Sequence, residues 1–183
     1  MQKQRLLDAV VGHLASGGSG DVTLRGIAAA VGTSHRMLIY HFGSKEQLLV
    51  DVVREVEARQ KAALADLADC PPEEMGRLFW KRLTSPELRP LERLFFELYG
   101  QAAQGRLGET GLLDGIVDDW LPALVALGLS QGMTPQRARA SARLALAVSR
   151  GLLLDLVATD DLEAVNEAME LFLDLYSTAS TPR

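Results

Sequence analysis

The chain has 183 residues, of which 48% are hydrophobic and 23% charged, and its net charge is −5. This composition supplies a globular core and excludes an intrinsically disordered chain. A single cysteine, Cys70, excludes an intramolecular disulfide and is typical of a reducing compartment, so we expect a soluble, cytoplasmic protein. We expect neither a signal peptide nor a membrane span, because the longest apolar stretch, around 144–158, is interrupted by Arg150 and Asp155.

The charge is distributed unevenly along the chain. Residues 1–50 hold five basic side chains against three acidic ones, whereas the remaining residues hold 14 basic against 21 acidic. All three histidines also lie in the first 50 residues. This asymmetry indicates an N-terminal part suited to approaching a polyanion and a remainder that is not.

Helical periodicity, interrupted by proline and glycine, runs along the whole chain, and no stretch shows sustained strand alternation. We therefore predict an all-α protein with about nine helices. In chain order they cover about 3–15, 24–31, 34–42, 44–67, 73–83, 91–104, 112–127, 135–157 and 160–176. Several starts carry capping signals, namely Thr23, Ser44 with Gln47, Thr134 before a proline, and Asp160.

Residues 23–49 have the pattern of a helix-turn-helix. This motif needs a small residue where its two helices cross, a residue tolerant of positive φ in the turn, and apolar anchors on both helices. Ala28 is the small residue and Gly32 the turn residue. The anchors occur in register, as Ile27 and Val31 on the first helix and Leu38 and Phe42 on the second.

The outer face of the second helix of this motif suits DNA. With Leu38 directed inward, helical rotation places Arg36 and Tyr40 outward, with Met37 and Thr33 beside them. Arginine can bind guanine O6 and N7, and hydroxyl groups can bind phosphates. Lys45, in the first turn of the next helix, can join the free N–H groups there in holding a phosphate. The alternative interpretation is a helix face that is merely solvated.

The sequences TLRGIAAAVG (23–32), LIYHF (38–42) and SKEQLL (44–49) resemble the DNA-binding domain of the TetR family of repressors. The resemblance covers about the first 50 residues. It implies a three-helix DNA-binding domain over 1–50, a long connecting fourth helix, and a helical ligand-binding and dimerisation domain over 51–183. It also implies DNA contacts, or support for them, at Thr33, Tyr40, His41 and Lys45.

The chain departs from the family pattern at three positions, so no operator sequence is carried over from the resemblance. Arg36 and Met37 stand where glycine and then threonine or serine are frequent, and Ile39 where tyrosine is frequent. The complete set of expected DNA-binding residues is Thr23, Arg25, Thr33, Ser34, His35, Arg36, Met37, Tyr40, His41 and Lys45.

The last two predicted helices have the pattern of a dimerisation surface. Two helices from each protomer would form an isologous four-helix bundle, and the alternative is an ordinary helix pair within one protomer. The expected dimerisation residues are Leu144, Val148, Leu152, Leu156, Val165, Met169 and Phe172.

Aromatic residues outside the first 50 residues are grouped along the sequence. A helical domain of this size could enclose an apolar pocket between them, although they could equally fill the core. The expected ligand-binding residues are Phe79, Trp80, Phe95, Phe96, Tyr99 and Trp120.

These patterns favour a ligand-responsive regulator of transcription, a homodimeric repressor that a small apolar or aromatic effector releases from a palindromic operator. We expect no enzyme activity, cofactor or metal site, because the sequence has no phosphate loop, nucleophile motif or Cys/His cluster. The alternatives are a helical-bundle enzyme, a small-molecule carrier, or an activator without an effector.

Overall fold

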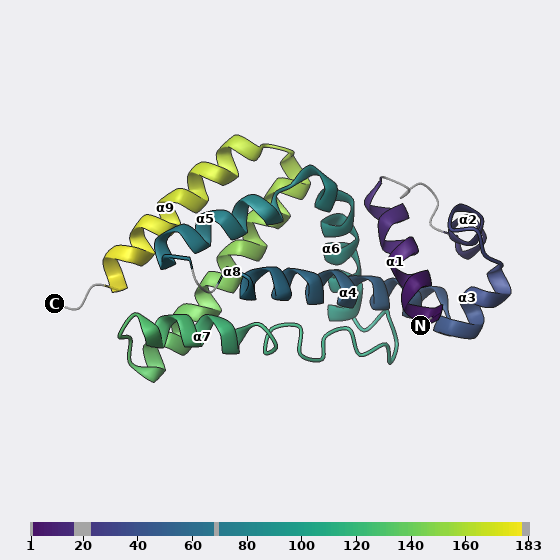
Figure 1. Ribbon diagram of the computed structural model, residues 1–183, viewed down its shortest axis with the longest axis horizontal. Coiled ribbons are helices and arrows are strands. Elements are labelled where there is room, and N and C mark those ends of the chain that lie inside the picture. The colour runs from purple at the N-terminus through teal and green to yellow at the C-terminus, as the bar shows by residue number, and fades with distance from the viewer. Residues whose placement is uncertain (1, 17–22, 68–69, 181–183) are drawn as a thin grey trace. The chain divides into compact units, whose positions relative to one another are not determined.

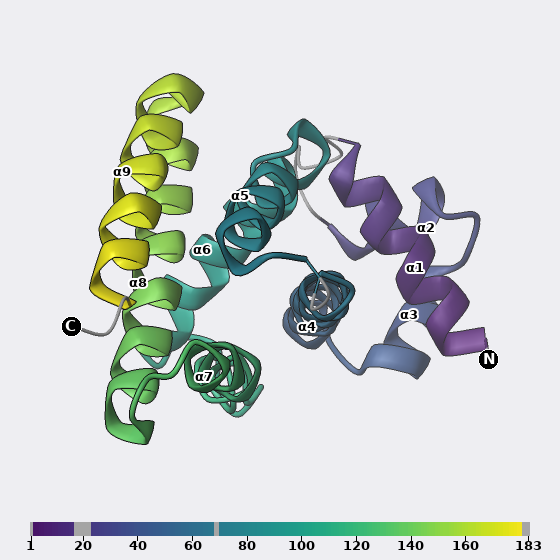
Figure 2. The same cartoon turned by 60° about the vertical axis from the view of Figure 1, so that its left-hand side comes forward.

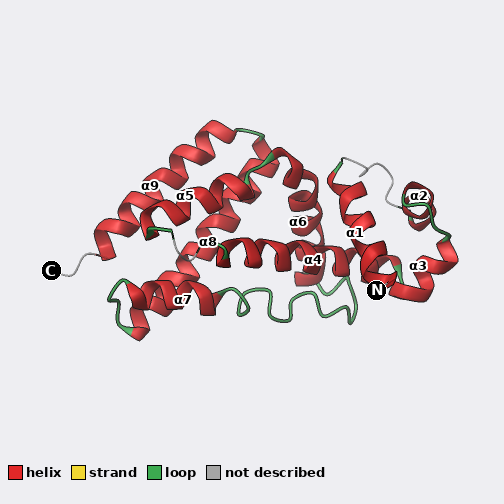
Figure 3. Ribbon diagram, in the orientation of Figure 1, coloured by secondary structure: helices red, strands yellow, loops and turns green. Residues whose placement is uncertain are grey.

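The computed structural model describes residues 2–16, 23–67 and 70–180 (Figures 1 and 3). These ranges form nine α-helices, one 3-10 turn and no strand, which confirms the predicted all-α class. None of the described helices is long and apolar enough to cross a membrane. The helices are α1 (Gln2–Ala15), α2 (Leu24–Ala30), α3 (His35–Phe42), α4 (Lys45–Ala65), α5 (Pro72–Leu83), η1 (Pro86–Leu88), α6 (Arg89–Ala103), α7 (Leu121–Ser130), α8 (Pro135–Thr159) and α9 (Leu162–Ser180).

The chain divides by packing into two compact units. Unit 1 comprises Met1–Arg59 and Pro86–Leu113, and unit 2 comprises Gln60–Ser85 and Asp114–Arg183. Helix α4 contributes to both units because the division falls within it. Packing therefore divides the chain differently from the functional division predicted after residue 50, since α6 packs against α1 inside unit 1.

The predicted start signals act as helix caps. The hydroxyl oxygens of Thr23, Ser44 and Thr134 accept hydrogen bonds from backbone N–H groups three residues ahead, at 3.1, 3.0 and 3.3 Å. The last helix differs from the prediction. Asp160 ends α8 in a left-handed conformation, with φ 59°, and Asp161 caps α9 through the N–H of Ala164 at 3.0 Å.

The helix predicted over 112–127 is correct only in its second half. Leu112, Ile116 and Trp120 are buried with helical spacing, but the chain over 112–120 forms turns and α7 begins after them. Gly115 has φ +72°, and a Cβ there would lie 2.7 Å from the carboxylate of Asp119. The apolar spacing thus predicts burial correctly, while the backbone at this glycine excludes a continuous helix.

Unit 1 is held together by an apolar core and by polar contacts between α1 and α4. Buried apolar residues of α1, α3 and α4 form the core around Val10, Leu38 and Val50. The amine of Lys3 lies 3.0 Å from the carboxylate of Asp51. Two further contacts join the same helices, because Arg59 binds Asp8 at 2.5 Å and Gln4 binds Glu55 at 3.1 Å.

Unit 2 contains an apolar cluster and a tightly packed helix pair. The buried members of the cluster are Leu64, Met75, Trp120 and Leu146. Helix α5 packs against α9, and α8 packs against both α7 and α9 (Figure 2). Trp80 Nε1 donates to Asn166 Oδ1 at 2.8 Å, which joins α5 to α9.

Arg77 provides a second polar link between α5 and α9. Its guanidinium binds Glu170 at 2.7 Å and Asp174 at 3.1 Å. The hydrogen bond and negative charge of Glu170, with a smaller contribution from Asp174, raise the pKa of Arg77. These contacts fix which side of α9 faces α5.

Replacing the turn glycine, Gly32→Ala, should lower the free energy of unfolding by about 1–2 kcal/mol. Gly32 has φ +70°, and an added Cβ would meet no atom within 4 Å, so the cost is conformational rather than steric. Urea denaturation followed by circular dichroism measures the change. Gly12→Ala is the matched control, because Gly12 lies within α1 with equally open surroundings. This substitution should raise the free energy of unfolding by about 0.5–1 kcal/mol. Equal effects at both positions would contradict the prediction.

Candidate nucleic-acid interface

Helix α3 has one buried face and one exposed face. Leu38 and Phe42 are buried, together with Ile27 and Ala28 of α2, as the helix-turn-helix pattern predicts. Tyr40 is 78% exposed, on the opposite side of α3. Arg36 is also exposed, and Met37 and Thr33 are half-buried beside it. The predicted contact residues of this helix are therefore brought together on one open face.

The remaining predicted contact residues surround α3. Thr23 and Ser34 are exposed, and their hydroxyl oxygens already accept from Gly26 N and Met37 N, so each keeps its own O–H to donate. Arg25 and His35 are exposed as well. Hydroxyl and cationic donors beside an open helix suit the phosphate backbone of DNA.

Lys45 lies half-buried at the first position of α4. The Ser44 hydroxyl satisfies the N–H of Gln47, the predicted capping-box partner. The Gln47 amide nitrogen donates to Asp51 at 2.9 Å, so it supports α4 rather than the cap. A lysine ammonium beside a helix N-terminus can hold a phosphate.

The base of α3 is supported by Lys3, a contact that sequence reasoning missed. Lys3 Nζ lies 5.1 Å above the ring of Phe42 while it also pairs with Asp51. The N-terminus of α1 is thereby attached to the end of α3 and to α4. The sequence signal was weak, because a lysine at the start of a helix and an aspartate 48 residues later form no local pattern.

His41 occupies a less open position than its neighbour Tyr40. The two rings lie 5.0 Å apart in an edge-on arrangement. His41 is half-buried, and its Nε2 is buried with no hydrogen-bond partner among the described residues. This placement favours a supporting role for His41 behind Tyr40. Ile39, which is exposed beside Tyr40, is a further apolar candidate that the prediction omitted.

The six aromatic residues predicted to bind ligand do not form one group. Phe95, Phe96 and Tyr99 lie on α6 in unit 1, where the ring of Phe95 is 5.1 Å from Phe96 and 5.7 Å from Tyr99. Phe79, Trp80 and Trp120 belong to unit 2. The rings of Phe79 and Trp120 lie 6.2 Å apart within the apolar cluster, and Lys61 Nζ lies 6.0 Å from the Trp120 ring.

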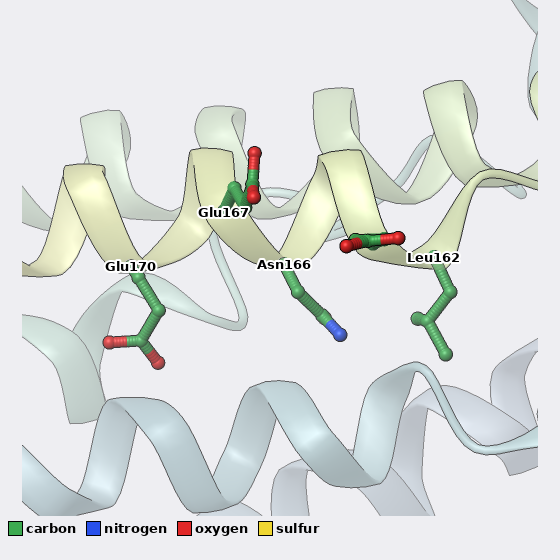
Figure 4. Close-up of a pocket in the computed structure, with 5 residues that line it drawn as sticks. Leu162, Asn166, Glu167 and Glu170 are labelled. Atoms are coloured by element: carbon green, nitrogen blue, oxygen red, sulfur yellow. The ribbon is translucent and has the colours of Figure 1, made fainter.

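Unit 2 also has a hollow of about 670 Å³ along α9. Its lining residues are Leu162, Glu163, Asn166, Glu167 and Glu170, and Figure 4 shows Leu162, Asn166 and Glu170 directed away from the α9 axis toward the neighbouring helix. None of the predicted aromatic residues lines this hollow. Within the described residues, no cluster of His, Cys, Asp or Glu is placed to hold a metal ion.

The predicted dimerisation residues occupy different faces. Leu144 is 55% exposed, Val148 and Leu152 are half-buried, and Leu156 is 1% exposed. A spacing of four residues rotates by about 40° per step, so this series turns from solvent into the core. On α9, Val165 and Met169 are also buried. Leu156, Val165 and Met169 therefore pack inside the protomer, and the predicted surface needs correction at these positions.

Comparison with known proteins identifies the N-terminal segment. Residues 6–52 match the family model of bacterial regulatory proteins, tetR family. The matched range includes α2, α3 and the start of α4, which carry the exposed face described above. No curated protein sequence matches the chain.

Solved structures share the fold over nearly the whole chain. A TetR-family transcriptional regulator from Pectobacterium atrosepticum has a TM-score of 0.75 and 18% identity, and the match covers 100% of this chain and 96% of that one. A TetR-like transcriptional regulator from Rhodococcus sp. RHA1 has a TM-score of 0.62 and 25% identity, with coverage of 96% and 93%. The multidrug binding protein EbrR, complexed with imidazole, has a TM-score of 0.62 and 24% identity, with coverage of 100% and 90%.

The helix-turn-helix in residues 6–52 and the shared all-helical fold lead to one assignment. Residues 6–52 carry the DNA-binding segment of bacterial regulatory proteins of the tetR family, and the chain shares the all-helical fold of TetR-family transcriptional regulators.

Proposed function

We propose that the chain is a homodimeric repressor that binds a palindromic operator through α3 and is released by a small apolar effector. The observation that carries this proposal is the two-sided character of α3. Leu38 and Phe42 fix one face in the core, while Arg36 and Tyr40 stand open on the other. The protein would act in the cytoplasm, where the chromosome of a bacterium lies.

In this proposal α3 enters the major groove. Arg36 binds a guanine through O6 and N7, which reads sequence, while Tyr40 and Thr33 donate to phosphates. Lys45 and the N–H groups at the start of α4 hold a further phosphate. The other proposed contacts, at the edge of this face, are Thr23, Arg25, Ser34, His35 and Met37, and His41 supports Tyr40 from behind.

Dimerisation would use the exposed apolar stripes of α8 and α9. On α8 the exposed residues alternate in steps of four and three, which keeps them on one face. They are Ala140, Leu144, Ala147, Gly151, Leu154 and Ala158. The stripe on α9 consists of Ala164, Ala168, Leu171 and Leu175, of which the two leucines are 61% and 62% exposed. Exposed leucines in such a row are characteristic of an interaction surface.

A dimer also meets the geometric requirement of a palindrome. Its two recognition helices must reach successive major grooves about 34–36 Å apart. One α3 helix contacts a single half-site, whose few base contacts give limited specificity. A twofold dimer doubles these contacts and makes the spacing between half-sites part of recognition.

The apolar cluster around Trp120 is the proposed effector site. Seven partly buried hydrophobic residues surround its four buried members, so part of its apolar surface remains open to solvent. Lys61 beside the Trp120 ring supplies a polar group at the edge of the cluster. EbrR, whose fold is similar, is a multidrug binding protein, which supports an apolar or aromatic effector here.

Release from DNA would follow from unequal affinity of the effector for two states of the dimer. The effector would bind more tightly to the state in which the two α3 helices do not match successive grooves. The shift toward that state cannot exceed the difference between the free energies with which the effector binds the two states. Helix α4 is continuous from the proposed phosphate contact at Lys45 to Leu64 in the apolar cluster. It is therefore the proposed connection between the two sites.

Two substitutions should affect DNA binding differently. Arg36→Ala should cost about 1–3 kcal/mol at the selected operator and relax discrimination at one base pair, because it removes a base contact. Lys45→Ala should weaken binding to all sequences alike and reduce the slope of log K against log salt by about one, because it removes a phosphate contact. The operator is first selected from a random duplex library, and affinities are measured by fluorescence anisotropy at several salt concentrations.

Arg93→Ala is the matched control for these variants. Arg93 is an exposed arginine on α6, so its loss changes the net charge equally without altering the proposed DNA face. The affinity of the Arg93→Ala variant for the operator should match that of the wild type. Equal losses for all three variants, or failure of selection to recover a palindrome, would contradict the proposed reading of DNA.

Leu171→Asn should weaken the dimer, because it places an amide in the centre of the proposed apolar stripe. Sedimentation velocity should show a shift toward monomer at concentrations where the wild type is dimeric. Leu129→Asn is the control, since Leu129 is an exposed leucine on α7, outside the stripes. A dimer unaffected by Leu171→Asn would exclude this surface.

Binding of an apolar effector should change the fluorescence of Trp120. The chain has two tryptophans, so Trp80→Phe leaves Trp120 as the single emitter. Titration with small aromatic compounds should shift its emission, and the same compounds should release the operator. Compounds that release the operator without affecting Trp120 would place the effector elsewhere.

A further inference from the structure

A charged pair lies at the edge of the apolar cluster around Trp120. Lys61 of α4 is half-buried, and its Nζ lies 6.0 Å from the centroid of the Trp120 ring. The same Nζ lies 3.4 Å from a carboxylate oxygen of Asp119. A lysine cation above an indole ring is attracted by the electrons of the ring. The Lys61 cation is therefore positioned where the apolar cluster meets solvent.

The carboxylate that pairs with Lys61 is the more solvated partner. The Asp119 side chain is 61% exposed, whereas the Lys61 side chain is 33% exposed. Their separation of 3.4 Å is longer than the roughly 2.7–2.9 Å of a charge-assisted hydrogen bond. Exposed ion pairs of this kind contribute little to stability. Asp119 therefore holds the Lys61 cation only weakly.

The backbone at Gly115 makes room for the Asp119 carboxylate. A Cβ on Gly115 would lie 2.7–2.8 Å from three atoms of that carboxylate, and the Asp119 N–H donates to the Gly115 carbonyl at 2.9 Å. Arg150 of α8 holds the same turn, because its guanidinium donates to the Ile116 carbonyl at 2.6 Å. The turn is thus attached to α8 independently of the ion pair, so the ion pair can open while the turn keeps its place.

The apolar cluster and the Lys61 cation would select different parts of one ligand. Partly buried residues such as Phe79, Val117 and Leu121 pack against the buried members of the cluster, so an apolar body can bury its surface among them. A neutral apolar ligand would leave the cation with its weak partner, and a cationic ligand would be repelled by it. A ligand with an apolar body and one negative charge suits both parts.

We propose that the effector is an amphipathic acid, whose apolar body enters this cluster and whose carboxylate takes the place of Asp119 at the Lys61 ammonium. This inference rests on the proposed effector site and names the chemical class of its ligand. Because the apolar body excludes water, an ion pair formed on the cluster side is stronger than the exposed pair that it replaces. A single ammonium balances one negative charge, which favours a carboxylate over a dianionic phosphate.

This exchange of partners would connect the effector directly to α4. Lys61 lies on α4, on the same helix as Leu64 of the cluster. In the free protein Lys61 pairs with the turn that precedes α7, and in the bound protein it would pair with the effector. Binding therefore replaces a contact between α4 and that turn. A contact that differs between the free and bound states is what a ligand needs to shift the balance between them.

The test compares three probes that share one apolar body, namely phenylbutyrate, phenylbutyramide and phenylbutylamine. Each is titrated into the full chain carrying Trp80→Phe, and the emission of Trp120 gives its Kd. Phenylbutyrate should bind about 10-fold more tightly than the amide, because it gains a charge-assisted contact, and the amine should bind most weakly. Release of the operator, followed by fluorescence anisotropy, should rank the probes in the same order.

Substitutions at the ion pair should act in opposite directions. K61M should abolish the preference for phenylbutyrate over the amide and leave the Kd of the amide unchanged, whereas K61R should retain the preference. D119N should lower the Kd of phenylbutyrate about threefold, because it removes the competing charge of a weak, exposed pair. An opposite effect of the two partners on one probe is not expected from a loss of stability.

K81M and D118N are the matched controls. Lys81 is exposed on α5, and Asp118 is exposed beside Asp119 but takes part in no ion pair among the described residues. Both controls should leave the Kd of all three probes unchanged. Added NaCl should weaken binding of phenylbutyrate to the protein with Lys61 but not to the K61M variant, since it screens the ion pair. Damage to the fold would instead weaken all three probes alike.

The outcomes separate this inference from the effector site on which it rests. Equal affinity for phenylbutyrate and phenylbutyramide would overturn the recognition of a carboxylate and leave the apolar site standing. A preference for phenylbutyrate that survives K61M would overturn the role of Lys61 in the same way. Failure of all three probes to change the emission of Trp120 would overturn the proposed site itself, and the inference with it.

Discussion

The attachment of α1 to α4 fixes the direction in which the exposed face of α3 points. Lys3, Gln4 and Asp8 reach residues of α4 that lie about 50 positions later in the chain. Exposed ion pairs of this kind contribute little individually, but they act here on helices that already share a buried core. Lys3 also covers the ring of Phe42 at the end of α3. The recognition helix, α1 and the first half of α4 therefore form one body.

In the proposed function, α4 would carry a change in the apolar cluster of unit 2 to this body. Leu64 belongs to that cluster and lies on the same helix as Asp51, to which α1 is attached. A displacement along α4 would carry the recognition helix with it, because no loop separates the two positions. The proposed dimer surface on α8 and α9 and the proposed effector site at the cluster both belong to unit 2.

Local signals predicted most of the helices and the exposed face of α3. Caps and the turn at Gly32 depend on residues within four positions of each other, and the structure confirms Thr23 and Ser44 as caps. The six aromatic residues were grouped by sequence, but packing distributes them over two units. Three of the predicted dimerisation residues, Leu156, Val165 and Met169, are buried within the protomer, because α8 and α9 have apolar residues on more than one side. Sequence spacing alone cannot show which of them face another helix of the same protomer.

The packing of α6 against α1 has a consequence for the modularity of the protein. Helix α6 lies in unit 1 although some 40 residues of unit-2 and α4 sequence separate it from the DNA-binding helices. A recombination event that joined residues 1–59 to the remainder of another regulator would replace α6 and expose the side of α1 that it covers. Exchange of sensing domains within such proteins would then require compatible α1 and α6 sequences, so these two helices should change together during evolution.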